Sequence, residues 1–429
     1  MEFEAIERYL VHRDPVGYRI HSGLALVALV LAPLWQAPSS VAFALLGGYA
    51  LLRTPNTWRA WSALLSCAAV VAWTCLGLLL MASLSWAPFG TSTGFDHLGA
   101  WRVMLFPLLL LPVLPSRRWL VAAALAGCMI QFGLMLGDDA TTGQRWLGPL
   151  RNVNLTAFWG ACLASGGLAL LLRGRWPLAL MGFVITAAGA ATTMLTQSRG
   201  GFLALTASCS GVALLGILAA RGRSRWIVLA RAGCVVAIAV GTLLWHRSPT
   251  VGRLERNLER SASLDPTARS TESLLRTVDP ARFHLWRLAA THAMERPVVG
   301  WGLGSFRHFL KSLDPLDRAW WATPEVPRSM SSVAKLQGSH SAYFRVACEQ
   351  GLVGLAVLAM AVGATLARTA ALARIDTVAL GGFGVTIAWL AYAGTEDAHL
   401  LTRGLVPIAL CLSLSCGLLG GGTSRRAEC

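Results

Sequence analysis

The chain has 429 residues, of which 55% are hydrophobic and only 14% are charged, and its formal net charge is +16. This composition excludes an ordinary soluble domain and predicts a polytopic membrane protein. The basic residues alternate with apolar segments, which indicates topology signals and not a nucleic-acid partner. The ten cysteines lie in apolar runs or at the extreme terminus, so they predict neither disulfides nor a metal site.

Apolar stretches long enough to cross a bilayer recur along the chain, and their backbone must be helical to satisfy its own hydrogen bonds. A polar segment without a small-residue cleavage site precedes the first of them, so we expect this stretch to remain as an anchor. We predict twelve spans, at residues 20–36, 39–53, 61–84, 100–115, 119–137, 155–172, 177–196, 201–220, 226–245, 341–366, 378–395 and 405–420.

The distribution of arginines sets the expected orientation. They concentrate in the N-terminal segment, in every second connection and in the C-terminal tail, which places both termini in the cytoplasm. The opposite, outer face collects acids and one large excursion. We therefore divide the chain into residues 1–245 with nine spans, a helical outer cap at 246–340, and residues 341–429 with three spans and a short cytoplasmic tail. The predicted fold is an all-α membrane helix bundle.

The outer cap carries a clear helix signal, with a start at Asp279-Pro280 and a stop at Pro297. The expected apolar stripe of this helix comprises Phe283, Trp286, Ala289, Ala290 and Ala293. The following glycine-rich stretch, 298–306, follows a helix and not a strand, so it favours a tight turn over a dinucleotide-binding loop.

Ionisable residues in the spans argue against a transporter. Arg102, Arg231 and Arg345 lie within a turn or two of a span end, where we expect their side chains to snorkel. Interrupted helices show no two-half repeat. The sequence therefore favours chemistry at the outer surface over passage through the membrane.

The stretch QSRGG, residues 197–201, forms the whole connection between the seventh and eighth spans and fixes Arg199 at the outer boundary. Ser198 is the expected N-cap of the next helix, and Gly200 and Gly201 would let a ligand approach the backbone amides. A helix N-terminus beside a guanidinium is a natural phosphate site. The sequence supports equally well an Arg199 that only contacts lipid headgroups at the membrane surface.

Two further positions in the outer region can carry chemistry. Arg282 and Trp286 share one face of the cap helix, with Arg287 beside them. On residue types alone we favour a solvated loop arginine; the alternative is an arginine that holds a phosphate, with the tryptophan against a lipid or sugar. His340 opens the tenth span at the outer face. The helix dipole and nearby arginines are expected to keep its imidazole neutral, as a general base; a capping or headgroup-contacting histidine is the alternative.

The remaining outer polar residues give weaker signals. His292, His308 and His340 lack metal-ligand spacing, and no carboxylate pair resembles a divalent-cation site, so no metal is predicted. We interpret the cluster Glu396, Asp397 and His399 as a solvated turn, with substrate orientation as the alternative.

Three stretches together resemble the O-antigen ligase and polymerase superfamily: QSRGG, RFHLWRLAATHAMERPVVGWGLGSF (282–306) and HSAYFRVACEQGLVGL (340–355). GPLRNVNLTAF (148–158) resembles, loosely, the start of the sixth span in that family. The resemblance implies a GT-C-type glycosyltransferase of the bacterial inner membrane with a periplasmic active site, acting in lipopolysaccharide biosynthesis. Its donor is an O-antigen glycan on undecaprenyl diphosphate. An O-antigen ligase transfers that glycan to a sugar hydroxyl of lipid A–core.

Carried over by motif, the resemblance implies His340 as the catalytic residue and Arg199, Arg282 and Arg287 as ligands of the diphosphate. Ser198, Gly200, Trp286 and Arg345 are candidates for supporting roles. Ser341 follows His340 at a position where the family often has asparagine. A contact that the asparagine amide makes in the family therefore has no equivalent in this chain. The implied reaction inverts the anomeric carbon and uses no metal or cofactor; its partners are the lipid-linked donor, lipid A–core and membrane lipids.

Other functions share parts of this pattern. An O-antigen polymerase or a protein O-oligosaccharyltransferase differs in the acceptor, and we favour the ligase because the chain is compact and carries no extra C-terminal soluble domain. A flippase for lipid-linked oligosaccharides, from a different class, predicts a polar path through the bundle and a dispensable His340.

Overall fold

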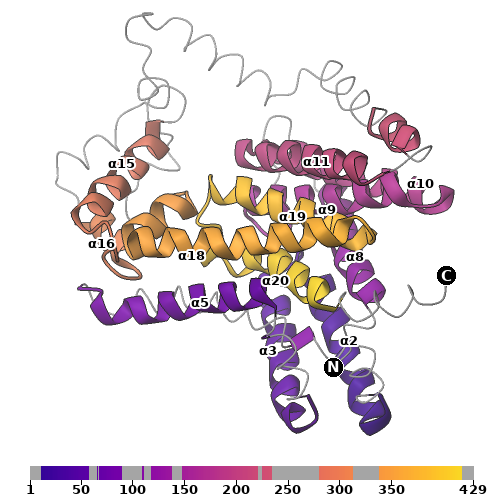
Figure 1. The fold of residues 1–429 in the computed structure, drawn as a ribbon, viewed down its shortest axis with the longest axis horizontal. Helices are drawn as coiled ribbons and strands as arrows, with labels where there is room; N and C mark the ends of the chain where they lie inside the picture. Colours follow the sequence, from indigo (N-terminus) through magenta and orange to yellow (C-terminus); the bar gives the residue numbers. More distant parts are fainter. Residues whose placement is uncertain are drawn as a thin grey trace, which may run out of the picture.

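The computed structural model describes residues 11–57, 65, 67–88, 109–110, 117–137, 147–220, 225–233, 280–312 and 338–417. Throughout these residues the regular structure is helical, with no strand (Figure 1). The helices are α2 (Pro15–Leu31), α3 (Gln36–Leu52), α5 (Ala68–Ser83), η1 (Leu84–Trp86), α8 (Arg117–Leu136), α9 (Val153–Arg173), α10 (Trp176–Leu195), α11 (Arg199–Ala219), α15 (Pro280–Glu295), α16 (Ser305–Lys311), α18 (Ala342–Ala373), α19 (Thr377–Ala393), η6 (Ala398–Leu400) and α20 (Thr402–Gly417).

Many of these helices are apolar enough to cross a membrane. Six have the necessary length: Ala68–Trp86, Arg118–Leu136, Val153–Arg173, Trp176–Leu195, Arg199–Ala219 and Ala342–Ala373. Four shorter apolar helices are Pro15–Leu31, Gln36–Leu52, Thr377–Ala393 and Arg403–Ser415. The fold is that of a polytopic helical membrane protein.

Parts of the predicted span plan cannot be compared with the structure. The predicted span 100–115 lies outside the described residues except for 109–110, and the span 226–245 is described, as helix, only to residue 233. The number of twelve spans and the GT-C-type architecture therefore stay predictions. So does the division of the chain into two membrane parts around an outer cap.

The starts of several helices follow directly from polar side chains that satisfy free backbone amides. Asn152 accepts hydrogen bonds from the amides of Asn154 and Leu155 at the start of α9, and Ser198 accepts one from Gly201 at the start of α11. The predicted N-cap at Ser198 is confirmed. Asp376 caps α19 in the same way.

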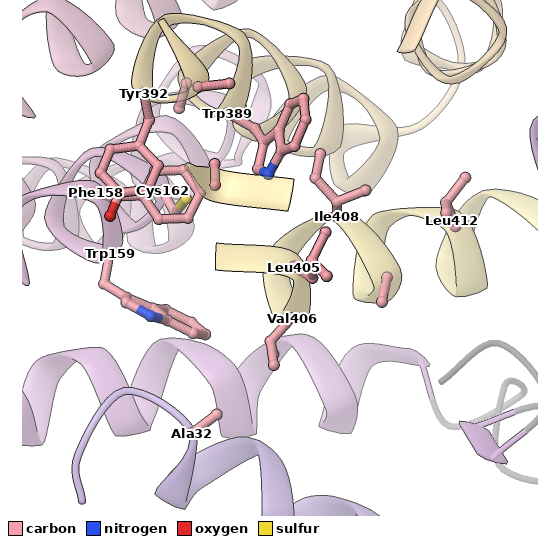
Figure 2. Packing of buried hydrophobic residues seen from close by; sticks show 14 of the residues in the cluster. Ala32, Phe158, Trp159, Cys162, Trp389, Tyr392, Leu405, Val406, Ile408 and Leu412 are labelled. Atoms are coloured by element: carbon pink, nitrogen blue, oxygen red, sulfur yellow. The ribbon is translucent and has the colours of Figure 1, made fainter. Parts of the chain in front are cut away.

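Helix α9 is the centre of the bundle and contacts α10, α11 and α19. Its packing against α10 depends on small residues: a Cβ added at Gly167 would lie 2.6 Å from the backbone nitrogen of Thr186, and one at Gly189 would lie 2.5 Å from that of Ala164. Close approach of backbones is how helices associate in lipid. Near the start of α9, Phe158 stacks on Tyr392 of α19 with ring centroids 4.6 Å apart (Figure 2).

The described part of the cap packs on the first turns of α18, where α15 and α16 gather at one end of the molecule (Figure 1). The predicted cap helix is present as α15. The stripe that we expected is only partly correct, because Leu285 and Ala289 are the fully buried residues of α15, whereas Phe283 and Trp286 are half-buried. Leu285 and Ala289 share a core with Phe306, Phe309, Leu310 and Cys348.

Helix α18 is interrupted at Gly351, which adopts φ 63° and ψ −158°. The backbone around this break pairs with the turn that follows α15: Trp301 N donates to Cys348 O, Gly302 N to Glu349 O, Leu352 N to Pro297 O, and Val353 N to Val298 O, at 2.7–3.1 Å. The predicted tight turn is therefore present, and it fastens the cap to both sides of the break.

The α9–α10 contact gives a test of the fold. Gly167→Val should force the two backbones apart and lower the free energy of unfolding by about 1–3 kcal/mol, which a thermal unfolding curve in detergent measures. Gly48→Val in α3 is the matched control, because a Cβ there meets nothing within 4 Å. Equal melting temperatures for the two variants would contradict the packing described above.

Candidate functional site

Polar side chains from five separate segments meet at the end of the bundle that carries the cap. Asn154 comes from the first turn of α9, Ser198 from the start of α11, and Arg282 from α15. His340 precedes α18, and Glu396 lies between α19 and η6. The structure thus brings together the three regions that carry the predicted site residues. It joins to them Glu396, for which substrate orientation was the alternative interpretation, and Asn154.

The carboxylate of Glu396 lies at the centre of this group. Its Oε1 accepts a hydrogen bond from Asn154 Nδ2 at 2.6 Å and one from Arg282 Nη2 at 3.3 Å, and its Oε2 lies 3.1 Å from His340 Nδ1. Glu396 is only 8% exposed. The interpretation of residues 396–399 as a solvated turn is therefore wrong: the turn is docked between α9, α15 and the start of α18.

The backbone of His340 is also constrained. It adopts φ 52°, in the left-handed region that residues other than glycine rarely occupy. The adjoining backbone is tied down, because Ala342 N donates to the carbonyl of Glu396 at 3.0 Å. Such a conformation persists where its surroundings over-determine it, and it is frequent at functional sites.

The pKa of His340 shifts in the direction opposite to our expectation. Burial lowers the pKa of His340, but the hydrogen bond and negative charge of Glu396, together with the charge of Asp397, outweigh burial and the opposing charge of Arg282, and the net effect raises the pKa. The expectation of a depressed pKa is wrong because it counted the arginines and the helix dipole and omitted the neighbouring carboxylates.

A second, deeper ionic group lies beside the first. Arg345, which is 1% exposed, donates from Nε to Glu349 Oε1 at 3.1 Å and from Nη1 to Asp397 Oδ2 at 3.0 Å. Asp397 also accepts from Ser339 Oγ at 2.8 Å. Burial would raise the pKa of Asp397, but Arg345 and its other neighbours lower it. Arg345 therefore neither snorkels nor faces a ligand: it holds Asp397 in place.

The start of α11 is linked to this site through one hydrogen-bond chain. Ser198 Oγ donates to Asn154 Oδ1 at 2.7 Å, and Asn154 in turn donates to Glu396. Arg199 is the first residue of α11 and is exposed. A Cβ at Gly200 would collide with the side chain of Thr395, so the glycine lets the start of α11 pack closely against the turn after α19. Its predicted role toward a ligand stays a prediction.

The two remaining candidates lie further along α15. The ring of Trp286 stacks on Phe344 with centroids 5.4 Å apart, so one face of this tryptophan is occupied by the protein. Arg287 is exposed. These positions are compatible with contact to a ligand above the site, and their predicted roles stay predictions.

Sequence reasoning missed Asn154 and Glu349 and misjudged His399. His399 is fully buried, and neither ring nitrogen has a hydrogen-bond partner in the described part of the chain. Burial lowers the pKa of His399 to about 3, so it is neutral. Asn154 could have been found from the sequence. Asn152 alone suffices to cap α9, so a second asparagine two residues later is not needed for capping and indicates another contact. Within the described ranges, no group of three or more His, Cys, Asp or Glu residues could hold a metal ion.

Fold and site define a polytopic helical membrane protein with a histidine–carboxylate–arginine group at one end of the bundle. Residues 181–359 match the family model Wzy_C, described as O-Antigen ligase. This match supports assignment of the chain to the O-antigen ligase/polymerase family, whose members are glycosyltransferase-like enzymes, and it confirms the resemblance seen in the motifs. A search of curated proteins finds no match to the chain. The matched range includes Arg199, Arg282 and His340, whereas Asn154 and Glu396 lie outside it.

The buried ionic group gives a second test. Arg345→Ala should leave two carboxylates buried without their cation and destabilise the protein by about 3–5 kcal/mol, measured by thermal unfolding or as a reduced yield of folded protein. Arg287→Ala, on the exposed face of α15, is the control and should change stability by less than about 0.5 kcal/mol. A stable Arg345→Ala protein would argue against the structural role given to this arginine.

Proposed function

We propose that this protein is an O-antigen ligase of the bacterial inner membrane. It transfers a glycan from undecaprenyl diphosphate to a sugar hydroxyl of lipid A–core at the periplasmic face, with inversion of the anomeric carbon and without a metal. The observation that carries this proposal is the His340–Glu396 pair, 3.1 Å apart, with Arg282 on the same carboxylate. His340, a base, and Arg282, a cation, thus contact the same carboxylate and lie close together. A reaction between a hydroxyl and a diphosphate needs both groups.

The pair fixes which nitrogen of His340 acts as the base. An ionised carboxylate only accepts hydrogen bonds, so Nδ1 must carry the proton that faces Glu396 Oε2. The lone pair of the neutral ring then resides on Nε2, the nitrogen available to a substrate. When Nε2 takes a proton, Glu396 stabilises the imidazolium, as the carboxylate does in the Ser-His-Asp arrangement. Glu396 is thus a positioning residue and His340 the catalytic one.

The diphosphate needs fixed positive charge on the opposite side of the reacting carbon. Arg282 is half-buried and oriented by Glu396, and Arg199 stands at the N-terminus of α11, where backbone amides and the helix dipole favour an anion. Guanidinium groups form bidentate contacts with phosphate oxygens and keep their charge at any physiological pH. Arg287 is exposed on α15, and in this proposal it contacts the outer part of the same ligand.

The reaction balances with these groups alone. The acceptor oxygen forms a bond to the anomeric carbon as the bond from that carbon to the phosphate oxygen breaks. The electron pair of the broken bond leaves with undecaprenyl diphosphate, whose growing charge the arginines stabilise. The acceptor proton passes to His340 Nε2. Attack from the face opposite the leaving group inverts the configuration at the anomeric carbon.

Transfer by purified protein tests this function directly. Protein supplied with undecaprenyl-diphosphate glycan and lipid A–core should form a glycosylated lipid A–core, detected by a ladder on a gel, and the reaction should persist in a chelator. Extension of a second lipid-linked glycan would identify a polymerase, and a glycosylated protein acceptor an oligosaccharyltransferase. Translocation of the donor between leaflets without any product would identify a flippase.

His340→Ala is the variant that tests the base. It should lower the transfer rate by about 10²–10⁴-fold, the usual contribution of a general base. His12→Ala, at an exposed position near the N-terminus, is the matched control and should transfer normally. Near-normal ladders from correctly inserted His340→Ala protein would exclude the assigned role.

The pH dependence of transfer tests the pair. The base form of His340 is lost as pH falls through its raised pKa, so the acid limb of wild-type activity should lie at higher pH than an unperturbed histidine would give. Glu396→Gln removes the charge that raises this pKa, so the acid limb of its profile should move to lower pH. Its maximal rate should also fall, because an amide can donate to Nδ1 and place the ring proton on Nε2. An unshifted acid limb in this variant would refute the pairing.

A further inference from the structure

A second polar cavity lies far from the candidate site. Its volume is about 1030 Å³, and its walls include three arginines, Arg173 at the end of α9, Arg231 in the helical segment 225–233, and Arg374 after α18. We refer to this cavity as the arginine cleft. None of these three residues has a part in the transfer reaction.

The position of the arginine cleft follows from the length of α9. This helix begins beside Glu396, through Asn154, and ends at Arg173, which lines the cleft. At a rise of 1.5 Å per residue the two positions are about 30 Å apart, which equals the thickness of the hydrocarbon core. We therefore place the cleft at the opposite membrane boundary. The C-terminal end of α18, which Arg374 follows, lies at the end of that helix away from α15 and α16 (Figure 1).

The arginines are held in the wall of the cleft by the protein itself. Arg231 Nη1 donates to the carbonyls of Leu171, Leu172 and Gly174 at 2.8, 3.3 and 3.1 Å, which fixes its guanidinium at the C-terminal end of α9. Arg173 is half-buried and Arg374 exposed. One acid is close: Asp376, which caps α19 and acts electrostatically on Arg173. Three cations and one acid leave a surplus of positive charge.

The edge of the arginine cleft is apolar. Leu218, Ile227 and Ile375 line the cavity and are 66%, 46% and 77% exposed. Two tryptophans in the adjoining helices, Trp176 and Trp226, are also largely exposed. Exposed tryptophan beside aliphatic side chains is typical of the level where lipid headgroups meet hydrocarbon. A ligand in this cleft therefore contacts both the arginine guanidinium groups and the exposed aliphatic side chains.

We propose that the arginine cleft binds the phosphate of an anionic glycerophospholipid, with the acyl chains lying against the apolar edge. The guanidinium groups contact the phosphodiester oxygens and the positive surplus selects an anionic headgroup over a zwitterionic one, as basic pockets between membrane helices do. This site is separate from the transfer reaction and does not depend on the proposed function.

Lipid binding by the purified full-length protein tests this proposal. Wild-type protein in phosphatidylcholine nanodiscs is titrated with phosphatidylglycerol, and bound lipid is counted by native mass spectrometry. Each arginine near an anionic headgroup contributes about fivefold in affinity, so Arg173→Gln/Arg374→Gln should bind phosphatidylglycerol about 25-fold more weakly. Arg231 is left intact because its hydrogen bonds support α9. Arg175→Gln is the matched control, an exposed arginine two residues from Arg173 that does not line the cleft.

Thermal unfolding in phosphatidylcholine alone checks that the variants are folded. If the double variant does not fold, the exposed Arg374→Gln gives the same comparison, with about a fivefold loss. Unchanged affinity in the folded variant, or an equal loss in Arg175→Gln, would overturn the site. Displacement of phosphatidylglycerol by millimolar inorganic phosphate would show a free-phosphate site and overturn the lipid assignment.

Discussion

The carboxylate of Glu396 joins parts of the chain that lie far apart in sequence. It contacts His340 before α18, Arg282 on the cap helix and Asn154 at the start of α9, and the carbonyl of the same residue accepts a hydrogen bond from Ala342. A buried carboxylate is costly without such partners. The side chain of Glu396 therefore sets the separation between His340 and Arg282. It also docks its own turn, between α19 and η6, against the start of α9.

Glu396 and Asp397 are adjacent in sequence but serve two networks with different exposure. Glu396 faces the partly open group around His340, whereas Asp397 belongs to the deeper group with Arg345 and Ser339. The two nearby histidines differ accordingly: carboxylates raise the pKa of His340, and burial lowers that of His399 to about 3. At neutral pH His399 is therefore uncharged, whereas the carboxylates favour the protonated form of His340.

Helix positions, the cap helix and the N-cap at Ser198 followed from hydropathy and local signals, because these depend on neighbours in sequence. The role of Glu396 did not, since its bond to Asn154 spans 242 residues and no periodicity encodes it. Gly200 illustrates a related limit of sequence: a glycine signals close approach, but only the fold shows that Thr395 is one of the groups that approach it. The pKa of His340 was misjudged because its sign depends on a carboxylate brought in by tertiary structure.

The interruption at Gly351 has a mechanical consequence. Amides on the far side of the break bond to carbonyls of the turn after α15, and carbonyls on the near side accept from that turn. Lifting the cap by itself would break these four hydrogen bonds. Because the turn is bonded on both sides of the break, α15 is tied to the first turns of α18 and to the rest of that helix alike, and these bonds hold Arg282 and His340 at a constant spacing.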